Sequence, residues 1–248
     1  MLYLLAWRDV KIRYKQTAIG VLWALLQPFL SMVIFSVVFG HFAKLPTAGV
    51  PYPILTYSAL LPWLLFTSSL TVATNSVVVN QPLVTKVYFP RLAIPVGPAL
   101  APLVDFVIGF FILGGLMVWY GFVPSWHAIA LPVFTLFAVL TALAVGLWLA
   151  ALNVRYRDVQ YAIPFIQQLW MYATPVAYSI LIFPLWLRPY IGLNPMAGVV
   201  QGFRWCLLGS SAGQVGHLMM LSFGIVVVLL AGGIAYFRRV ERSFADVI

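Results

Sequence analysis

The chain has 248 residues, of which 63% are hydrophobic and only 8% are charged, and its formal net charge at pH 7 is +9. A water-soluble domain of this length cannot bury that much apolar surface and still present a polar exterior. The composition therefore excludes a soluble fold and predicts an all-α, polytopic membrane protein. Because a bilayer core takes about 20 apolar residues per helix, the chain has room for roughly six transmembrane helices and for no large soluble domain.

Residues that form disulfides or bind metals are scarce. The single Cys206 excludes an internal disulfide and a cysteine-based metal cluster. The three histidines are far apart in the sequence and lack the spacing of metal ligands, so we expect no metal site. Basic residues continue to Lys15 and a full-length apolar run follows, so we expect no removable signal peptide.

Residues 1–16 carry an amphipathic pattern. Four apolar or aromatic side chains share one helical stripe: Tyr3, Trp7, Val10 and Tyr14. Three basic side chains lie elsewhere on the same helix: Arg8, Lys11 and Lys15. The pattern predicts an interfacial helix on the membrane surface. Such a helix serves as a lipid anchor with snorkelling lysines or as a dock for a cytoplasmic partner, and the two roles are compatible.

The first apolar run covers residues 18–42, and the second covers about 52–79. The second run is less hydrophobic because it contains Ser, Thr and Asn. The connection that follows reads NQPLVTKVYFPRLAIP and begins with Asn80-Gln81-Pro82, a helix-start signal. It is long for a simple link between spans. Residues 80–92 are either a simple connection or a short helix parallel to the membrane, which can transmit force if a soluble motor grips it.

The remaining apolar runs cover about 96–120, 129–152, 161–181 and 217–236. The fourth run of the chain ends at the charged stretch NVRYRDV. Between the last two runs lies FPLWLRPYIGLNPMAGVVQGFRW, which is apolar but interrupted by prolines and glycines. This stretch predicts short re-entrant or interfacial helices before the last span.

The basic residues are distributed unevenly over the connections. With the N-terminus inside, eleven of the 14 Lys and Arg fall in the cytoplasmic segments. Only three fall on the other side: Lys44, Arg188 and Arg204. The positive-inside rule therefore predicts that both termini are cytoplasmic. Anionic lipid accounts for the positive charge, so no nucleic-acid partner is needed.

Five stretches, taken together and in this order, resemble a known family: RDVKIRYKQTAIGVLWALLQPFL, LVTKVYFPRLAIP, LNVRYRDV, LNPMAGVVQGFRW and ERSFADVI. They resemble the membrane subunits of ABC exporters that move polysaccharides, namely the O-antigen, capsule and teichoic-acid permeases. The likeness covers nearly the whole chain. It implies a homodimer of six-span subunits in the bacterial inner membrane, with two ATPase subunits docked underneath and a lipid-linked glycan as substrate.

The sequence contains no GxxxxGK[ST] phosphate-binding loop, so the energy must come from another chain. The resemblance accordingly implies that this chain is a permease rather than an enzyme, and that ATP and Mg are bound by the partner ATPase. It also implies ATPase-coupling residues in the N-terminal helix and the connector: Arg8, Lys11, Lys15, Asn80, Lys86, Phe89, Pro90 and Arg91. We expect Arg155, Arg157 and Asp158 to cap helix ends and brace the connector, with direct ATPase contact as the alternative.

Aromatic residues make up 16% of the chain, including nine Trp. Many lie near span ends, where an interfacial belt or packing is the ordinary explanation. A sugar chain, however, presents apolar faces between its hydroxyls, and aromatic rings suit a path along which it slides. On the first and fifth spans the candidates for that path are Trp23, Gln27, Trp170, Tyr172 and Tyr178. Gln27-Pro28 and Thr174-Pro175 predict kinks in these two spans.

Asp105 is the acidic residue inside a predicted span, and an intramembrane carboxylate is a functional-site hypothesis by default. Its alternative role is structural, through protonation or a hydrogen bond to a neighbouring helix, and we favour that role because the family pattern often carries an acid here. The alternative functions are an ABC exporter of a small hydrophobic compound, a proton-coupled carrier that uses Asp105, and a membrane transferase. The transferase is disfavoured because the five acidic residues are scattered.

Overall fold

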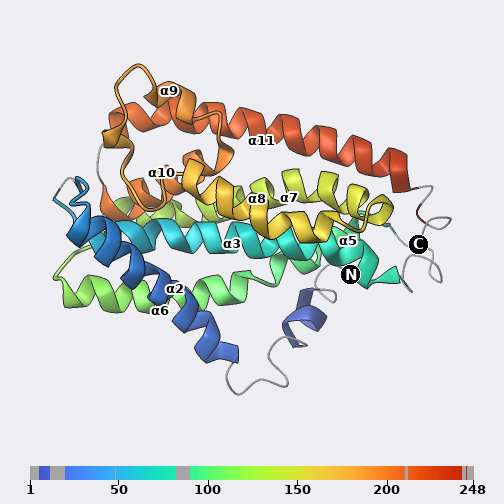
Figure 1. Ribbon diagram of the computed structural model, residues 1–248, viewed down its shortest axis with the longest axis horizontal. Helices are drawn as coiled ribbons and strands as arrows, with labels where there is room; N and C mark the ends of the chain where they lie inside the picture. Colours follow the sequence, from blue (N-terminus) through green and yellow to red (C-terminus); the bar gives the residue numbers. More distant parts are fainter. Residues whose placement is uncertain are drawn as a thin grey trace.

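The computed structural model describes residues 6–11, 20–47, 49–81, 90–209, 212–241 and 244. Over these residues the fold is all-α, as predicted, and Figure 1 shows an elongated bundle whose long helices run roughly side by side. Five helical stretches in the described residues are long and apolar enough to cross a bilayer: Leu22–Phe42, Tyr52–Val79, Ala93–Trp119, Trp126–Arg155 and Gly216–Val240.

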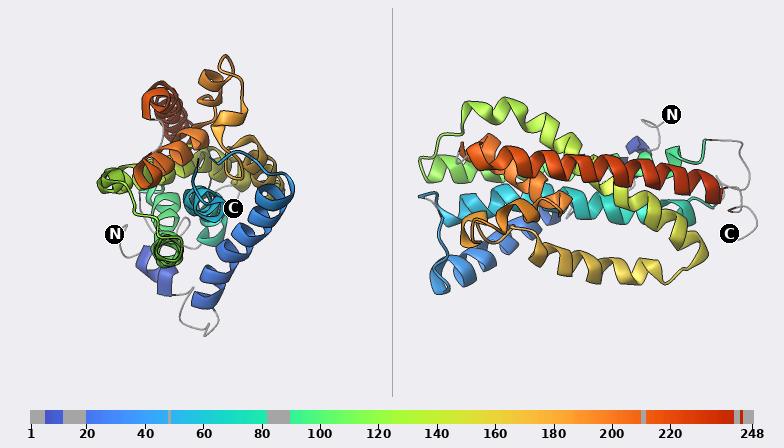
Figure 2. Two further views of the ribbon diagram at one scale, coloured as in Figure 1. Left: turned by 90° about the vertical axis from the view of Figure 1, so that its left-hand side faces the viewer. Right: turned by 90° about the horizontal axis from the view of Figure 1, so that it is seen from above.

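Helix α3 (Tyr52–Val79) is the centre of the bundle. In the end-on view of Figure 2 the other helices surround it, and 78% of its most apolar window is buried, against 11% for Leu22–Phe42. Several of its Ser and Thr hydroxyls are compatible with this burial because they bond to carbonyls of their own helix. Thr74 Oγ1, for example, donates to Leu70 O at 2.8 Å.

The first apolar run forms α2 (Gly20–Phe35), which continues as a π-helical segment (Ser36–Phe42). Pro28 lies inside α2, at the position where a kink is predicted. Figure 1 shows α2 crossing the bundle obliquely on the side of α3 where α6 also lies.

The third run begins with a broken stretch before its long helix. Helix α5 (Ala93–Val96) is followed by a 3-10 turn (Pro98–Leu100) and then by α6 (Leu103–Trp119). The prolines in this stretch remove backbone donors and interrupt the regular helix. Ser69 on α3 donates to the carbonyl of Ala99 at 2.8 Å, which satisfies part of the broken backbone.

The fourth run packs tightly against α3 and against the last run. A 3-10 turn (Trp126–Ala130) leads into α7 (Leu131–Arg155), and the chain ends on the long α11 (Ala212–Val240). The indole of Trp148 on α7 lies against glycines of α11 and donates to Leu229 O at 3.0 Å. A β-carbon at Gly146 would come within 3.0 Å of Ala73 on α3. Small residues therefore permit the close approach of these helices.

The predicted fifth run differs in the structure. Helix α8 (Val159–Ala173) has only 15 residues, about 22 Å of helix, and it ends where the predicted run continues. Pro175 cannot donate a backbone hydrogen bond, so Thr174-Pro175 marks a helix end rather than a kink. The six-span count therefore stays a prediction.

Short helices occupy the stretch between α8 and α11. They are a 3-10 turn (Ile180–Ile182), α9 (Arg188–Ile191) and α10 (Pro195–Leu208). Nearly all of α10 is buried, and it packs against α3, α7 and α11. The short elements agree with the predicted interruptions, whereas their re-entrant placement in a bilayer stays a prediction.

The ends of α3, α5, α7 and α11 meet at one end of the bundle, at the right in Figure 1. A buried apolar cluster joins them and includes Val77, Ile94, Val154, Phe237 and Phe244. The rings of Phe237 and Phe244 meet edge to face at 5.3 Å. We call this end of the bundle the basic end, because it carries these residues: Arg8, Lys11, Arg91, Arg155, Arg157, Arg238 and Arg239.

Candidate functional site

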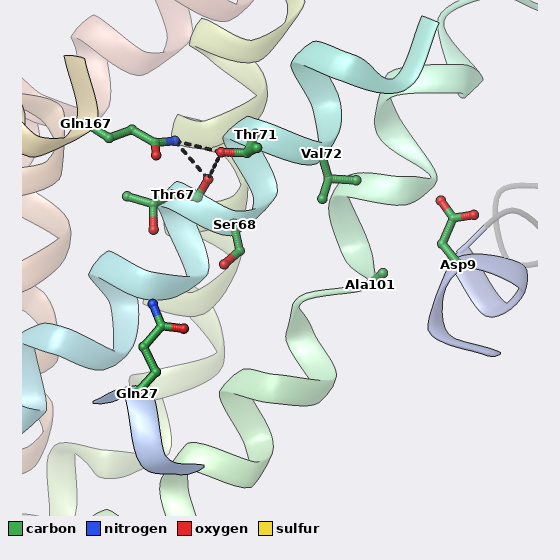
Figure 3. Close-up of a pocket in the computed structure, with 8 residues that line it drawn as sticks. All are labelled: Asp9, Gln27, Thr67, Ser68, Thr71, Val72, Ala101 and Gln167. Atoms are coloured by element: carbon green, nitrogen blue, oxygen red, sulfur yellow. Dashed lines mark hydrogen bonds between the residues drawn. The ribbon is translucent and has the colours of Figure 1, made fainter. Parts of the chain in front are cut away.

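A polar groove of about 380 Å³ lies between α2, α3 and α8 (Figure 3). Five uncharged polar side chains line it: Gln27, Thr67, Ser68, Thr71 and Gln167. The remaining lining residues are Asp9, Val72 and Ala101. In a chain this apolar, such a concentration of hydroxyl and amide groups marks a place built for polar contact.

Hydrogen bonds hold the polar groove together across α3 and α8. Gln167 Nε2 donates to the carbonyl of Thr67 at 3.0 Å and to the hydroxyl of Thr71 at 2.9 Å, as Figure 3 shows. The Thr71 hydroxyl donates in turn to the Thr67 carbonyl at 2.9 Å. Because Gln167 uses its amide nitrogen for α3, its amide oxygen remains available as an acceptor for a ligand.

A second groove, of about 610 Å³, continues toward the basic end. It shares Asp9, Thr71 and Val72 with the polar groove, so the two form one track along α3. Its polar lining adds Arg8, Asn75, Ser76 and Asn80. Thr67, Thr71 and Asn75 are spaced four residues apart and therefore share one face of α3. From Thr67 to Asn80 this track extends about 20 Å.

The end of the track nearest the basic end joins two segments that are distant in sequence. Arg8 Nη2 donates to Asn80 Oδ1 at 2.8 Å and forms an ion pair with Asp9 at 2.9 Å. Asn80 Nδ2 donates to the carbonyl of Ser76 at 2.8 Å and so fixes the end of α3. The N-terminal segment 6–11 is thereby tied to Asn80, the first residue of the connector.

An aromatic pocket of about 720 Å³ lies at the other end of α8. Its wall contains Trp170, Tyr172 and Tyr178, which the sequence places on the substrate path, together with Phe183 and Tyr190. The hydroxyl of Tyr178 donates to Tyr172 O at 2.8 Å. Four of the five predicted path residues thus fall into two sites, with Gln27 in the polar groove and Trp170, Tyr172 and Tyr178 in this pocket.

Asn194 organises the wall of the aromatic pocket. Its Oδ1 accepts from the indole of Trp170 at 2.8 Å and from the backbone N–H of Met196 at 3.1 Å, which caps α10. Its Nδ2 donates to Thr174 Oγ1 at 2.9 Å. One side chain therefore links the end of α8 to the start of α10. Trp23, by contrast, is 63% exposed on α2 and does not line the pocket or either groove.

The predicted ATPase-coupling residues are only partly within the described chain. The ammonium of Lys11 lies 5.8 Å from the centre of the Trp7 ring. Arg91, just after Pro90, donates to the carbonyl of Glu241 and so joins the connector side to the end of α11. Lys15, Lys86 and Phe89 lie outside the described residues.

The charges of NVRYRDV do not all act as predicted. Asp158 is exposed and occupies the N-cap position of α8 without a side-chain hydrogen bond to the helix. Its backbone is already helical, with φ −70° and ψ −18°, whereas a capping side chain requires an extended N-cap residue. The prediction that Asp158 caps the helix is therefore wrong. Arg155 lies in the last turn of α7, where a cation is favourable, and Arg157 is exposed.

Asn153 connects α7 to α3 near this point, although it is not among the site residues predicted from the sequence. Its Nδ2 donates to Asn75 Oδ1 at 3.2 Å and to the carbonyl of Thr74 at 3.3 Å. Asn75 also lines the track. An amide rather than a charge therefore positions the polar face of α3.

Asp105 lies midway along the stretch Ala93–Trp119 but in the first turn of α6. A negative charge is favourable there because the first backbone N–H groups of a helix are unpaired and the helix dipole is positive. It is half-buried and does not line the track or the aromatic pocket. In the described residues, no group of three or more His, Cys, Asp or Glu is placed to hold a metal ion.

Comparison with known proteins agrees with this architecture. The chain is 30% identical to the O-antigen export system permease protein RfbA of Myxococcus xanthus, over 100% of this chain and 95% of that protein. It is 24% identical to the protein of the same name from Klebsiella pneumoniae, with 97% and 92% covered. The polysialic acid transport protein KpsM of Escherichia coli is 21% identical, with 96% and 93% covered. The family description ABC-2 type transporter matches residues 1–208, so this chain belongs to the ABC-2 type transporter family and is a membrane subunit of such a transporter.

Proposed function

We propose that this chain is the membrane subunit of an ATP-driven exporter that moves a lipid-linked polysaccharide, such as an O-antigen, across the bacterial inner membrane. The observation that carries the proposal is the end-to-end similarity to permeases named for O-antigen export and polysialic acid transport. On this proposal residues 1–248 form one permease domain, with an interfacial helix at 1–16 and an ATPase connector at 80–92.

The lining of the two candidate sites supports a sugar as substrate. Glycan hydroxyls exchange hydrogen bonds with hydroxyl and amide side chains such as Thr67, Thr71 and Gln167. The apolar faces of sugar rings pack against aromatic rings such as those of Trp170 and Tyr178. A wall of neutral polar groups and aromatic rings binds each sugar weakly, so a long chain can slide along it.

The partners follow from the same proposal. Two copies of the chain surround the substrate path, and two ATPase subunits, which bind ATP and Mg, dock at the basic end. The positive-inside rule places that end in the cytoplasm. Arg8 and Asn80 then lie at the end where the ATPase subunits dock. Their hydrogen bond makes the N-terminal segment and the connector move together.

Glycan display on the cell surface tests the proposal. The chain is co-expressed with its candidate ATPase, and wild type is compared with Phe89→Ala/Arg91→Ala and with Asp105→Asn. We expect the connector variant to lose ATPase binding or export while Asp105→Asn remains largely active. If no ATPase co-purifies, and if an uncoupler and Asp105→Asn both stop transport, the chain is a proton-coupled carrier and the proposal is wrong.

A further inference from the structure

Arg204 is buried in the core of the bundle and bonds to backbone carbonyls. Its side chain is 4% exposed. Nη1 donates to Tyr178 O at 3.0 Å, and Nη2 donates to Val176 O at 2.9 Å and to Leu55 O at 3.4 Å. Burial of a guanidinium is unfavourable unless its donors are satisfied. The carbonyls pair with both terminal nitrogens and so hold Arg204 in place, whereas its buried Nε has no hydrogen-bond partner among the described residues. The positive-inside count places Arg204 in an outer connection, and the sequence does not indicate that Arg204 is buried.

The segment that Arg204 holds is the non-helical stretch directly after α8. The carbonyl of Ala177, between the two that Arg204 binds, accepts from the hydroxyl of Tyr52 on α3. Three successive carbonyls, from residue 176 to residue 178, are thus satisfied by two side chains of α10 and α3. Non-helical backbone inside a membrane protein needs such partners, because lipid supplies none.

The two sides of this contact differ in their surroundings. Arg204 belongs to α10, where close glycine contacts lock the helix to its neighbours, Gly198 against Ser222 and Gly202 against Phe134. Tyr178, on the held side, forms part of the wall of the aromatic pocket, where its ring meets Phe183 at 5.7 Å. The rigid helix α10 therefore fixes the position of a pocket wall through two carbonyls, and Tyr52 of α3 holds the carbonyl between them.

We propose that Arg204 is a positioning residue that fixes the wall of the aromatic pocket, and that release of residues 176–178 from Arg204 and Tyr52 opens this end of the substrate path. The inference rests on the proposed export function only for the identity of the transported molecule. In the held state Val176 is fully buried, at 0% exposure. In the released state its side chain becomes accessible to water.

Accessibility of residue 176 measures the released state directly. Cys206 is the one cysteine of the chain, so Cys206→Ala gives a background in which Val176→Cys is the sole thiol. Intact cells that express the chain with its ATPase are treated with a membrane-impermeant maleimide. We expect slow labelling with Arg204 present, and labelling at least about tenfold faster in Arg204→Met, because two short hydrogen bonds to the guanidinium are lost.

Two further variants separate positioning from general unfolding. Arg204→Lys retains a charged donor and is expected to restore part of the protection. Tyr52→Phe removes only the bond to Ala177 and is expected to accelerate labelling several-fold, even if Arg204→Met fails to assemble with the ATPase. Val123→Cys, at a position that is 83% exposed, serves as the accessible control and is expected to be labelled equally in every background.

The outcomes distinguish this inference from the export proposal. Equal labelling of Val176→Cys with Arg204, Arg204→Met and Tyr52→Phe overturns the positioning role, whatever the glycan assay shows. Faster labelling in the variants, in cells where the wild-type chain displays no glycan, supports the positioning role and overturns the export proposal. Faster labelling with wild-type glycan display supports both.

Discussion

Arg8 and Asn80 are 72 residues apart in the sequence, yet Arg8 Nη2 donates to Asn80 Oδ1 at 2.8 Å. The bond links the N-terminal segment 6–11 to the first residue of the connector. A force applied to either segment therefore reaches the other and the end of α3. The end of the track nearest the basic end lies at the same place, since Arg8 and Asn80 both line it.

Loss of the Arg8–Asn80 bond is expected to uncouple ATP hydrolysis from export. Asn80→Leu removes the acceptor and costs about 1–2 kcal/mol at this contact, with export reduced several-fold at unchanged complex yield. Asn80→Asp keeps an acceptor for Arg8 and is expected to retain more export than Asn80→Leu. The rates of ATP hydrolysis and of export are measured together in the purified complex. Equal export by Asn80→Leu and Asn80→Asp would show that the bond has no role in coupling.

Gln167→Leu is expected to slow export while leaving assembly intact. The substitution removes the two donated hydrogen bonds to α3 and the amide oxygen from the polar groove. Gln168→Leu is the matched control, because Gln168 is exposed and does not line the groove. We expect a several-fold larger loss of surface glycan for Gln167→Leu; a similar loss in both variants would count against the groove as a sugar contact.

Gly202→Ala is expected to destabilise the fold. A β-carbon there overlaps the ring of Phe134, so the helices must separate, which costs about 1–3 kcal/mol. Gly216→Ala, which has open space around the new β-carbon, is the control and should change stability little. Thermal unfolding in detergent compares the two, and a melting temperature for Gly202→Ala equal to wild type contradicts the packing described for α10.

Asn194 variants separate the cap of α10 from the pocket wall. Asn194→Asp keeps acceptors for Met196 and Trp170 but loses the donor to Thr174 and Ala173, whereas Asn194→Ala loses every side-chain hydrogen bond. We expect Asn194→Ala to lower stability by about 1 kcal/mol through the lost cap alone, and Asn194→Asp to retain most of it. Tryptophan fluorescence and thermal unfolding provide the readout, and an equal loss in both variants rules out the cap as the main contribution.

Much of this architecture follows from local patterns. The apolar runs locate α2, α3, α6, α7 and α11 because in lipid a backbone must satisfy itself within a helix. The spacing of Thr67, Thr71 and Asn75 was also visible, but hydroxyls in such helices commonly bond to their own backbone, so spacing alone does not identify a groove. The partner that makes it a site, Gln167, lies about 100 residues later and is brought there only by tertiary packing.

Two other features could not be read from charge or hydropathy. Arg204 was counted as an outer charge, since a positive-inside count records sign and position but not burial. The end of α8 at Ala173 depends on whether the residues after it find partners outside the helix. Those partners, Arg204 and Tyr52, belong to segments remote in sequence, so hydropathy alone extends the run too far.

The central position of α3 has a consequence for biosynthesis. Its mean hydropathy of 1.3 is the lowest of the five long stretches, which otherwise range from 2.0 to 2.5. It is therefore the segment with the weakest preference for lipid, yet it leaves the ribosome before α7, α8 and α10, which later cover it. At about 5–20 residues per second, several seconds separate its synthesis from that of its partners. During that interval the insertion machinery or the neighbouring α2 must cover the polar side chains of this helix. The polar residues that line the track therefore also make α3 the segment of the nascent chain most prone to misinsertion.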